Sequence, residues 1–138
     1  MKATEINPEA VLFANEALEK DTPFYMLNLL RFKEQADYGE YKDFKPCSGR
    51  EAYLTRYAPA FNKVTEGDDI KLLIAGTVIT SIVGPSDEHW ELAALVEYPS
   101  FTAFKKVIES ESYKTVAEPH RLAALEDLRL IATVNFPV

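Results

Sequence analysis

The stretch FYMLNLLRF, residues 24–32, decides the fold of this chain. It is short, apolar and aromatic, it follows the turn residue Pro23, and only Asn28 and Arg31 interrupt it. A run of this length and composition, bounded by a turn and by charges, is typical of a strand. We therefore expect a strand that is buried on both faces, as in sheets that are covered on two sides.

The residues before this strand predict a short amphipathic helix over 7–19. Asn7 is placed as its N-cap and Pro8 as its first helical residue, which are positions where both residue types are favoured. One face of this helix is apolar and carries Val11, Ala14 and Leu18. Residues 1–21 are thus expected to be a helical extension of a core that spans 22–136.

The residues after the strand predict a loop, a helix and a hairpin. Residues 33–46 are polar and bear tyrosines, which indicates an ordered surface loop. Ser48 and Glu51 form a capping box that opens a helix over 48–64, and Pro59 predicts a kink or break in it. Residues 70–83 are rich in Ile, Val and Thr and predict a long strand, which a turn at 84–87 joins to a third strand over 89–98.

The last part of the chain predicts helical segments and one more strand. Ser100 is the expected N-cap of a helix, a broken helical stretch should cover 110–118, and Pro119 begins a final turn or two through Leu125. Residues 128–136 alternate in a pattern that predicts a fourth strand. No internal repeat and no second domain are evident, so residues 1–138 are expected to form one domain.

This order of elements predicts an α+β fold. Strand, helix, strand, strand, helix, strand is the ferredoxin-like βαββαβ arrangement, an antiparallel four-stranded sheet with an extra N-terminal helix here. Right-handed crossovers place both core helices on one face of the sheet. The other face lacks a helix from the core.

That other face is expected to be apolar, because neither parity of residues 70–83 is polar. A soluble monomer seldom exposes an apolar surface as large as a sheet. We therefore expect a homodimer in which two sheets pack face to face. The alternative is that the N-terminal helix or residues 33–46 cover this face.

Composition narrows the range of partners. The chain has 138 residues, 15 Lys and Arg against 22 Asp and Glu, and a formal net charge of −7. This balance argues against nucleic acid and anionic membranes as partners, and no apolar run approaches the roughly 18 residues of a membrane span. The single cysteine, Cys47, fits a reducing compartment, so a cytoplasmic location is expected.

The residues in these elements resemble a known family, the domain of unknown function 1330 family. The similarity runs from about Thr22 to Phe136 and implies a dimeric α+β barrel, but no established reaction. The chain departs from the family in its N-terminal helix, in its long segment 33–46, and at Gly67–Asp69, where the family commonly has Gly-Gly-Lys. The matching residues are MLNLLRFK at 26–33, Tyr53, Tyr57, Trp90, VEYPS at 96–100, Ala103, Phe104, Tyr113, Arg121, AALE at 123–126, Arg129 and Leu130.

Polar residues inside or beside the apolar elements are the candidates for function. An amide in a buried strand must find partners, so Asn28 is either a ligand-facing group or a satisfied structural amide. Glu97 and His120 are the candidate catalytic acids or bases, although Glu97 could instead pair with Arg121 or Arg129. Arg121, at the expected start of a helix, points to an acidic partner or an anionic ligand.

Large amphipathic side chains complete the set of candidates. Tyr57 and Trp90 suit an aromatic pocket for a small ligand, and they equally suit a packed core. The two histidines, His89 and His120, do not have metal-ligand spacing, so no metal site is expected. The sequence has neither a phosphate-binding glycine loop nor a dinucleotide fingerprint, so no cofactor is expected.

Three functions remain open from the sequence. The first is a homodimer that binds a small apolar or aromatic carboxylate-type metabolite. The second is a cofactor-independent enzyme, an isomerase, lyase or oxygenase, in which Asn28 works with Glu97 or His120. The third is a structural dimer without a ligand.

Overall fold

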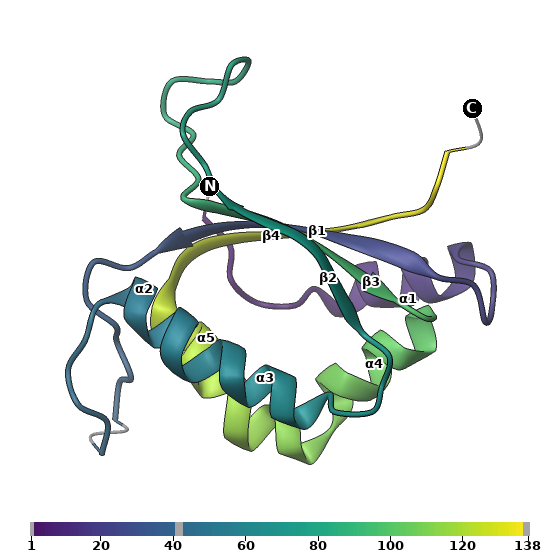
Figure 1. Cartoon of the computed structure of the whole chain (residues 1–138), viewed down its shortest axis with the longest axis horizontal. Helices are drawn as coiled ribbons and strands as arrows, with labels where there is room; N and C mark the ends of the chain where they lie inside the picture. Colours follow the sequence, from purple (N-terminus) through teal and green to yellow (C-terminus); the bar gives the residue numbers. More distant parts are fainter. Residues whose placement is uncertain (1, 41–42, 137–138) are drawn as a thin grey trace.

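The predicted strand at 24–32 forms as expected and lies inside a four-stranded antiparallel sheet (Figure 1). The structure is a computed structural model that describes residues 2–40 and 43–136. The strands lie in the order β2 (Lys71–Thr77), β3 (Leu92–Tyr98), β1 (Phe24–Phe32) and β4 (Leu125–Thr133). β1 therefore pairs with β3 on one side and with β4 on the other.

Burial alternates along β1, so the expectation of burial on both faces is wrong for the single chain. Phe24, Met26 and Leu30 are buried, whereas Tyr25, Leu27 and Leu29 between them are only half-buried. Successive side chains of a strand point to opposite faces. One face of β1 is thus covered by helices, and the other is open.

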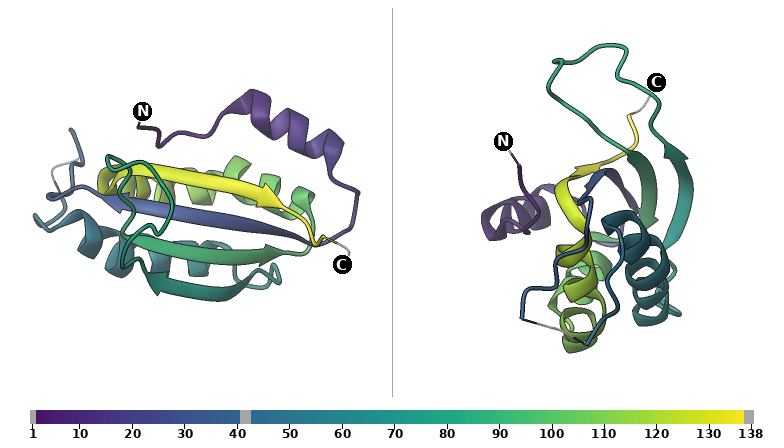
Figure 2. Two further views of the ribbon diagram at one scale, coloured as in Figure 1. Left: turned by 90° about the horizontal axis from the view of Figure 1, so that it is seen from above. Right: turned by 90° about the vertical axis from the view of Figure 1, so that its left-hand side faces the viewer.

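Helical segments cover one face of the sheet (Figure 2). The predicted caps are present, because the Ser48 side chain accepts from the Glu51 amide and Ser100 accepts from the Ala103 amide. Between β1 and β2 lie α2 (Gly49–Ala52), the π-helical η1 (Tyr53–Tyr57) and α3 (Ala58–Val64). Between β3 and β4 lie α4 (Phe101–Glu109), the π-helical η2 (Tyr113–Ala117) and α5 (Glu118–Ala124).

Each crossover contains one π-helical turn, and the two turns share a sequence pattern. Residues 51–59 and 111–119 both read Glu-x-Tyr-x-Thr-x-x-x-Pro, which is a local repeat that the hydrophobic pattern hides. In each, the threonine hydroxyl donates to the carbonyl four residues before it, 2.7 Å for Thr55 and 2.9 Å for Thr115. Proline lacks an N–H and crowds the turn before it, so the kink expected at Pro59 takes the form of a wider turn.

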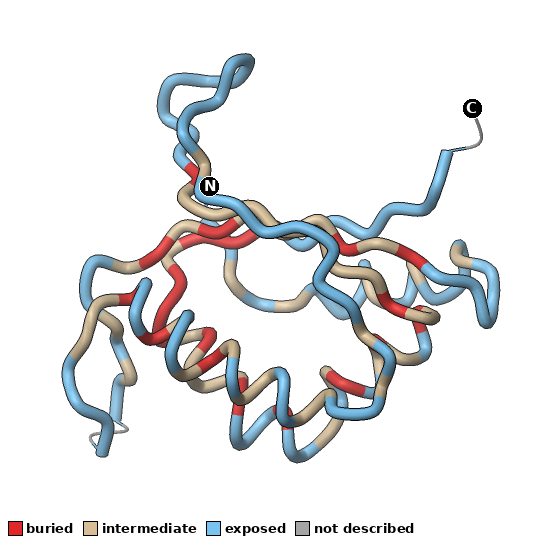
Figure 3. The backbone as a smooth tube through the Cα atoms, in the orientation of Figure 1, coloured by how far each residue is buried: buried red, intermediate tan, exposed pale blue. Residues whose placement is uncertain are grey.

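Four strand boundaries differ from expectation by three residues or more. Two of them are the start of β3, at Leu92 rather than at residue 89, and the end of β4, at Thr133 rather than at residue 136. β2 ends at Thr77, because the chain leaves the sheet after the Val78 amide bonds to the Glu91 carbonyl at 3.0 Å. Residues 79–90 then form an arm that rises from the sheet, and Ile79 and Ile82 in it are each 90% exposed (Figures 1 and 3). β4 begins at Leu125, directly after α5, rather than at residue 128.

The N-terminal helix forms as predicted, as α1 (Pro8–Ala17), with the Asn7 side chain accepting from the Glu9 and Ala10 amides. It lies beside the edge strand β4 and contacts α4, on the helical side of the sheet (Figure 2). The described part of segment 33–46 also lies away from the open face (Figure 1). The alternative in which either segment covers that face is therefore wrong.

Among the described residues, no helix is long and apolar enough to span a bilayer.

Gly49 is the glycine with the least space beside its Cα, and its amide bonds to the Lys33 carbonyl at 3.0 Å. A Cβ atom at this position would collide with the backbone oxygens of Lys33 and Ala124. We expect Gly49→Ala to lower the free energy of unfolding by about 1–3 kcal/mol, as overpacking does. Urea unfolding measures this effect. Gly76→Ala is the matched control, since a Cβ there meets no atom within 4 Å; equal losses for the two variants would contradict the prediction.

Candidate functional site

A cavity of about 250 Å³ lies between the sheet and the two π-helical turns. Its walls are mostly apolar and come from all the strands as well as from η1, α3, α4 and η2. The polar side chains that line it are Asn28, Tyr53, Tyr57, Tyr98, Tyr113 and Arg121, together with Asn62 and Thr65. A mostly apolar pocket with a few convergent polar groups is typical of small-molecule sites.

The π-helical turns supply three of the four tyrosines of this cavity, and β3 supplies the fourth, Tyr98. η1 supplies Tyr53 and Tyr57, whose rings stack with centroids 5.0 Å apart. η2 supplies Tyr113, whose hydroxyl lies 3.1 Å from the hydroxyl of Tyr57. Because single π-turns recur at functional sites, the repeat at 51–59 and 111–119 is the sequence pattern that could have located the site.

Burial keeps the phenols of Tyr53 and Tyr57 in their neutral form. It raises the pKa of Tyr57 well above its ordinary value, and the neighbouring Tyr113 and Tyr53 act in the same direction. Burial likewise raises the pKa of Tyr53. At neutral pH Tyr53 and Tyr57 therefore present phenol groups rather than phenolates to the cavity.

Arg121 is the cation of the site, and it is only 4% exposed. Its Nε donates to the Tyr113 hydroxyl at 3.1 Å, and its Nη2 lies 3.4 Å from a Glu118 carboxylate oxygen. The sequence places it at a helix start, where a cation is disfavoured. In the structure it lies in the last turn of the short helix α5, where the helix dipole favours a cation.

Asn28 faces the helices and lines the cavity, beside Ala94 of β3 and Leu130 of β4. Its Nδ2 donates to the Met26 carbonyl at 2.9 Å. Within the described residues, no hydrogen bond reaches its Oδ1. Nδ2 of Asn28 therefore has a structural role, whereas Oδ1 has no partner among the described residues. The side chain thus combines features of both roles that the sequence leaves open for it.

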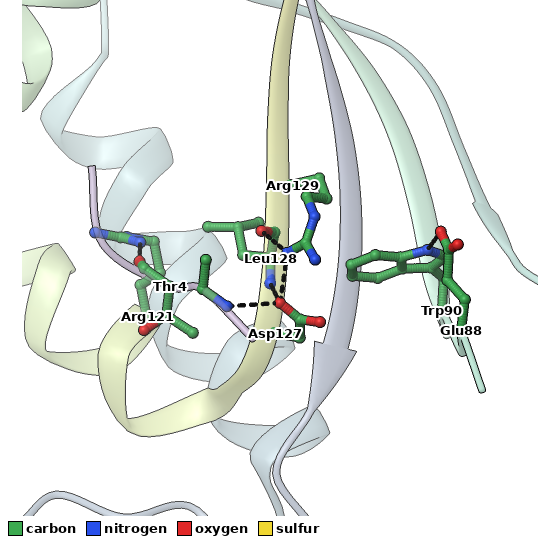
Figure 4. A network of polar contacts seen from close by, with 8 residues as sticks. Thr4, Glu88, Trp90, Arg121, Asp127, Leu128 and Arg129 are labelled. Atoms are coloured by element: carbon green, nitrogen blue, oxygen red, sulfur yellow. Dashed lines mark hydrogen bonds and ion pairs between the residues drawn. The ribbon is translucent and has the colours of Figure 1, made fainter. Parts of the chain in front are cut away.

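Residues 2–7, which we call the N-terminal strap, close one side of the cavity. The Leu128 amide bonds to the Ala3 carbonyl and the Ala3 amide bonds to Asp127, each at 2.8 Å. Further along, the Thr4 carbonyl accepts from Arg121 (Figure 4). Ile6 lines both this cavity and a second one of about 300 Å³ that lies beneath α1.

Three candidates from the sequence lie away from the cavity. Trp90 donates to Glu88 at 2.6 Å, and its ring centroid lies 5.0 Å from the Arg129 guanidinium (Figure 4). Arg129 alternates with Leu128 and Leu130, which line the cavity, so this stack belongs to the opposite face. Glu97 is also on that face and pairs with Lys71 at 3.9 Å rather than with an arginine. The structure therefore does not bring these residues together with Asn28.

His120, the third of these candidates, belongs to a separate cluster on segment 33–46. The Arg56 guanidinium donates to the Tyr38 hydroxyl at 3.1 Å, and that hydroxyl lies 2.7 Å from Nδ1 of His120. A guanidinium can only donate, so the Tyr38 oxygen accepts from Arg56. Burial and the charge of Arg56 lower the pKa of His120, which favours a neutral ring whose Nδ1 accepts the Tyr38 proton.

No protein-family model and no curated protein matches the chain. Among solved structures, the methylated RPA0582 protein has 31% identity and a TM-score of 0.85, over 99% of this chain and 96% of that one. The chain belongs to the RPA0582 family. A second structure of RPA0582, from Rhodopseudomonas palustris, has 30% identity and a TM-score of 0.85 over 100% of both chains.

RPA0582 is described as a protein of unknown function and as a structural genomics target. Membership of the RPA0582 family therefore fixes the fold and assigns no reaction. Within residues 2–40 and 43–136 of this family member, no three His, Cys, Asp or Glu side chains lie close enough together to hold a metal ion.

The pKa of His120 tests the cluster on segment 33–46. Burial, and after it the charge of Arg56, lowers this pKa below the ordinary 6.5. The stability that the neutral ring contributes is therefore complete above pH 6.5 and is lost as the pH falls through the lowered pKa.

We expect Tyr38→Phe to raise the pKa of His120 toward its ordinary value, because the variant removes the hydrogen bond that requires a neutral ring. Titration of the imidazole resonances by NMR measures this change, with His89 as the internal reference. A lowered pKa of His120 in the variant would show that Nδ1 donates to Tyr38, and an unchanged pKa would also contradict the prediction.

Proposed function

We propose that this member of the RPA0582 family binds a small apolar or aromatic carboxylate-type metabolite in the cavity between the sheet and the π-helical turns. The observation that carries the proposal is the buried cation Arg121 at the wall of a mostly apolar cavity. Arg121 pairs with Glu118 and also donates to the Tyr113 hydroxyl, so its charge makes the phenols of the cavity stronger donors to an anionic ligand. The apolar walls favour a hydrophobic body. A carboxylate attached to an apolar or aromatic group meets both requirements.

The size of the cavity agrees with this class of ligand. A dry protein cavity of about 150 Å³ is large enough to bind benzene. The cavity here has about 250 Å³, which leaves room for one ring and a short acid side chain.

Binding is a better proposal than the enzyme alternative. That alternative requires Asn28 to work with Glu97 or His120, and neither of these side chains lines the cavity. The third possibility, a structural dimer without a ligand, would leave the cavity and its polar groups without a role.

The assembly that we propose is a homodimer of ferredoxin-like subunits. The strand order β2-β3-β1-β4 and the βαββαβ element order support the ferredoxin-like assignment. The face of the sheet opposite the helices is apolar and open, with Leu73 49%, Ile74 65% and Ile131 47% exposed. Two such faces packed together would form an α+β barrel, and the arm at 79–90 would reach the second copy. The single cysteine and the net charge of −7 support the further proposal of a cytoplasmic protein without a membrane or nucleic-acid partner.

The dimer is tested by its mass in solution. We expect sedimentation equilibrium at micromolar concentration to give twice the chain mass of 15.6 kDa. Ile131→Glu places a charge on the open face and should give a monomer, because a buried unpaired carboxylate is strongly disfavoured. Leu12→Glu, at a residue of α1 that is 63% exposed, is the matched control and should stay dimeric. A monomeric wild-type protein would contradict the dimer.

Ligand binding is tested by thermal unfolding with phenylacetate and 3-phenylpropionate. A ligand at 100 times its Kd stabilises the folded state by about 2.7 kcal/mol, so Tm should rise with concentration. Ala94→Phe fills the cavity from β3 and should abolish the rise, whereas Thr102→Phe on the exposed side of α4 should retain it. If neither acid raises the Tm of the wild-type protein, the binding proposal fails.

A further inference from the structure

The hydrogen bonds around Arg121 form a chain that ends at the cavity. Arg121 donates through Nε to the Tyr113 hydroxyl, and that hydroxyl is 3.1 Å from the hydroxyl of Tyr57. The three residues are 4%, 3% and 9% exposed, respectively. All three line the cavity, so the chain runs through protein that solvent barely reaches.

A count of protons leaves one donor in this chain without an acceptor. The two phenols have one hydroxyl proton each, and the hydrogen bond between them uses one of these protons. Arg121 supplies its own proton to Tyr113 and cannot accept one. Among the hydrogen bonds of the described residues, none takes the second phenol proton.

The free proton belongs to Tyr57. An oxygen that accepts a hydrogen bond from a cation becomes a stronger donor through its own proton, because hydrogen bonds in a chain polarise one another. Tyr113 therefore donates to Tyr57, and the Tyr57 hydroxyl is left to donate into the cavity. The raised pKa of Tyr57 keeps this proton in place at neutral pH.

We propose that the Tyr57 hydroxyl donates a hydrogen bond to a carboxylate oxygen of the ligand, and that Arg121 strengthens this donor through Tyr113. The inference rests on the proposed binding function, and it names the side chain that makes the cavity specific for an anionic ligand. Tyr57 is the residue that contacts the ligand, and Tyr113 is a positioning residue. A charged acceptor gains more from a polarised donor than a neutral one does, so the site selects an anion over an apolar molecule of the same shape.

The test compares two probes of similar shape, 3-phenylpropionate and propylbenzene, by calorimetric titration of the full-length protein. We expect the wild-type protein to bind 3-phenylpropionate more tightly. Tyr57→Phe should weaken its binding by about tenfold or more, the change that corresponds to about 1.4 kcal/mol, and should leave propylbenzene binding within about twofold. Tyr113→Phe should give a smaller loss for the acid alone.

The ratio of the two affinities is the deciding readout, because a purely structural role for either tyrosine would weaken both probes equally. Tyr25→Phe removes a phenol from the opposite face of the sheet and should leave the ratio unchanged. If both probes bind and the ratio is the same in Tyr57→Phe as in the wild type, the hydrogen-bond assignment fails while the binding function stands. If neither probe binds the wild type, both fail.

Discussion

The buried guanidinium of Arg121 is the interaction on which the rest of this structure depends. It joins the Thr4 carbonyl of the N-terminal strap, the Tyr113 hydroxyl of η2 and the Glu118 carboxylate of α5. A buried charge without partners is strongly unfavourable, so these segments must come together around it. The same requirement places a cation, two phenols and the strap around one cavity.

The two π-helical turns are the structural means by which the cavity receives its polar groups. A regular helix would place Tyr53, Tyr57 and Tyr113 at a different angle to the sheet, because a π-turn adds a residue to one turn. Pro59 and Pro119 follow the turns at the same distance and prevent a regular ladder of hydrogen bonds there. The repeated sequence at 51–59 and 111–119 therefore orients tyrosines toward the cavity from both crossovers.

The sheet separates two environments that the sequence could not separate. Asn28, Tyr57 and Arg121 lie on the helical side and meet in the cavity, whereas Trp90 and Glu97 belong to the other side. Trp90 and Tyr57 look alike in sequence, as amphipathic rings in an α+β chain, so their grouping required the strand register. A shift of one residue exchanges the two faces of a strand. Similarly, His120 lies next to Arg121 in sequence but contacts a different cluster, because adjacent residues of a helix point in different directions.

The sequence by itself determined the local elements and their order. The caps at Asn7, Ser48 and Ser100 and the apolar run at 24–32 are short-range features, and they correctly predicted α1, α2, α4 and β1. Only the tertiary structure decided where β2 ends, which residues of each strand lie on the open face of the sheet, and that Arg121, Tyr113 and Tyr57 form one chain of hydrogen bonds. These features depend on contacts between residues far apart in the sequence, such as Thr4 with Arg121 and Tyr57 with Tyr113. The secondary-structure propensity of a short segment carries no information about such contacts, because they form and stabilise the protein only when distant segments have come together in the folded chain.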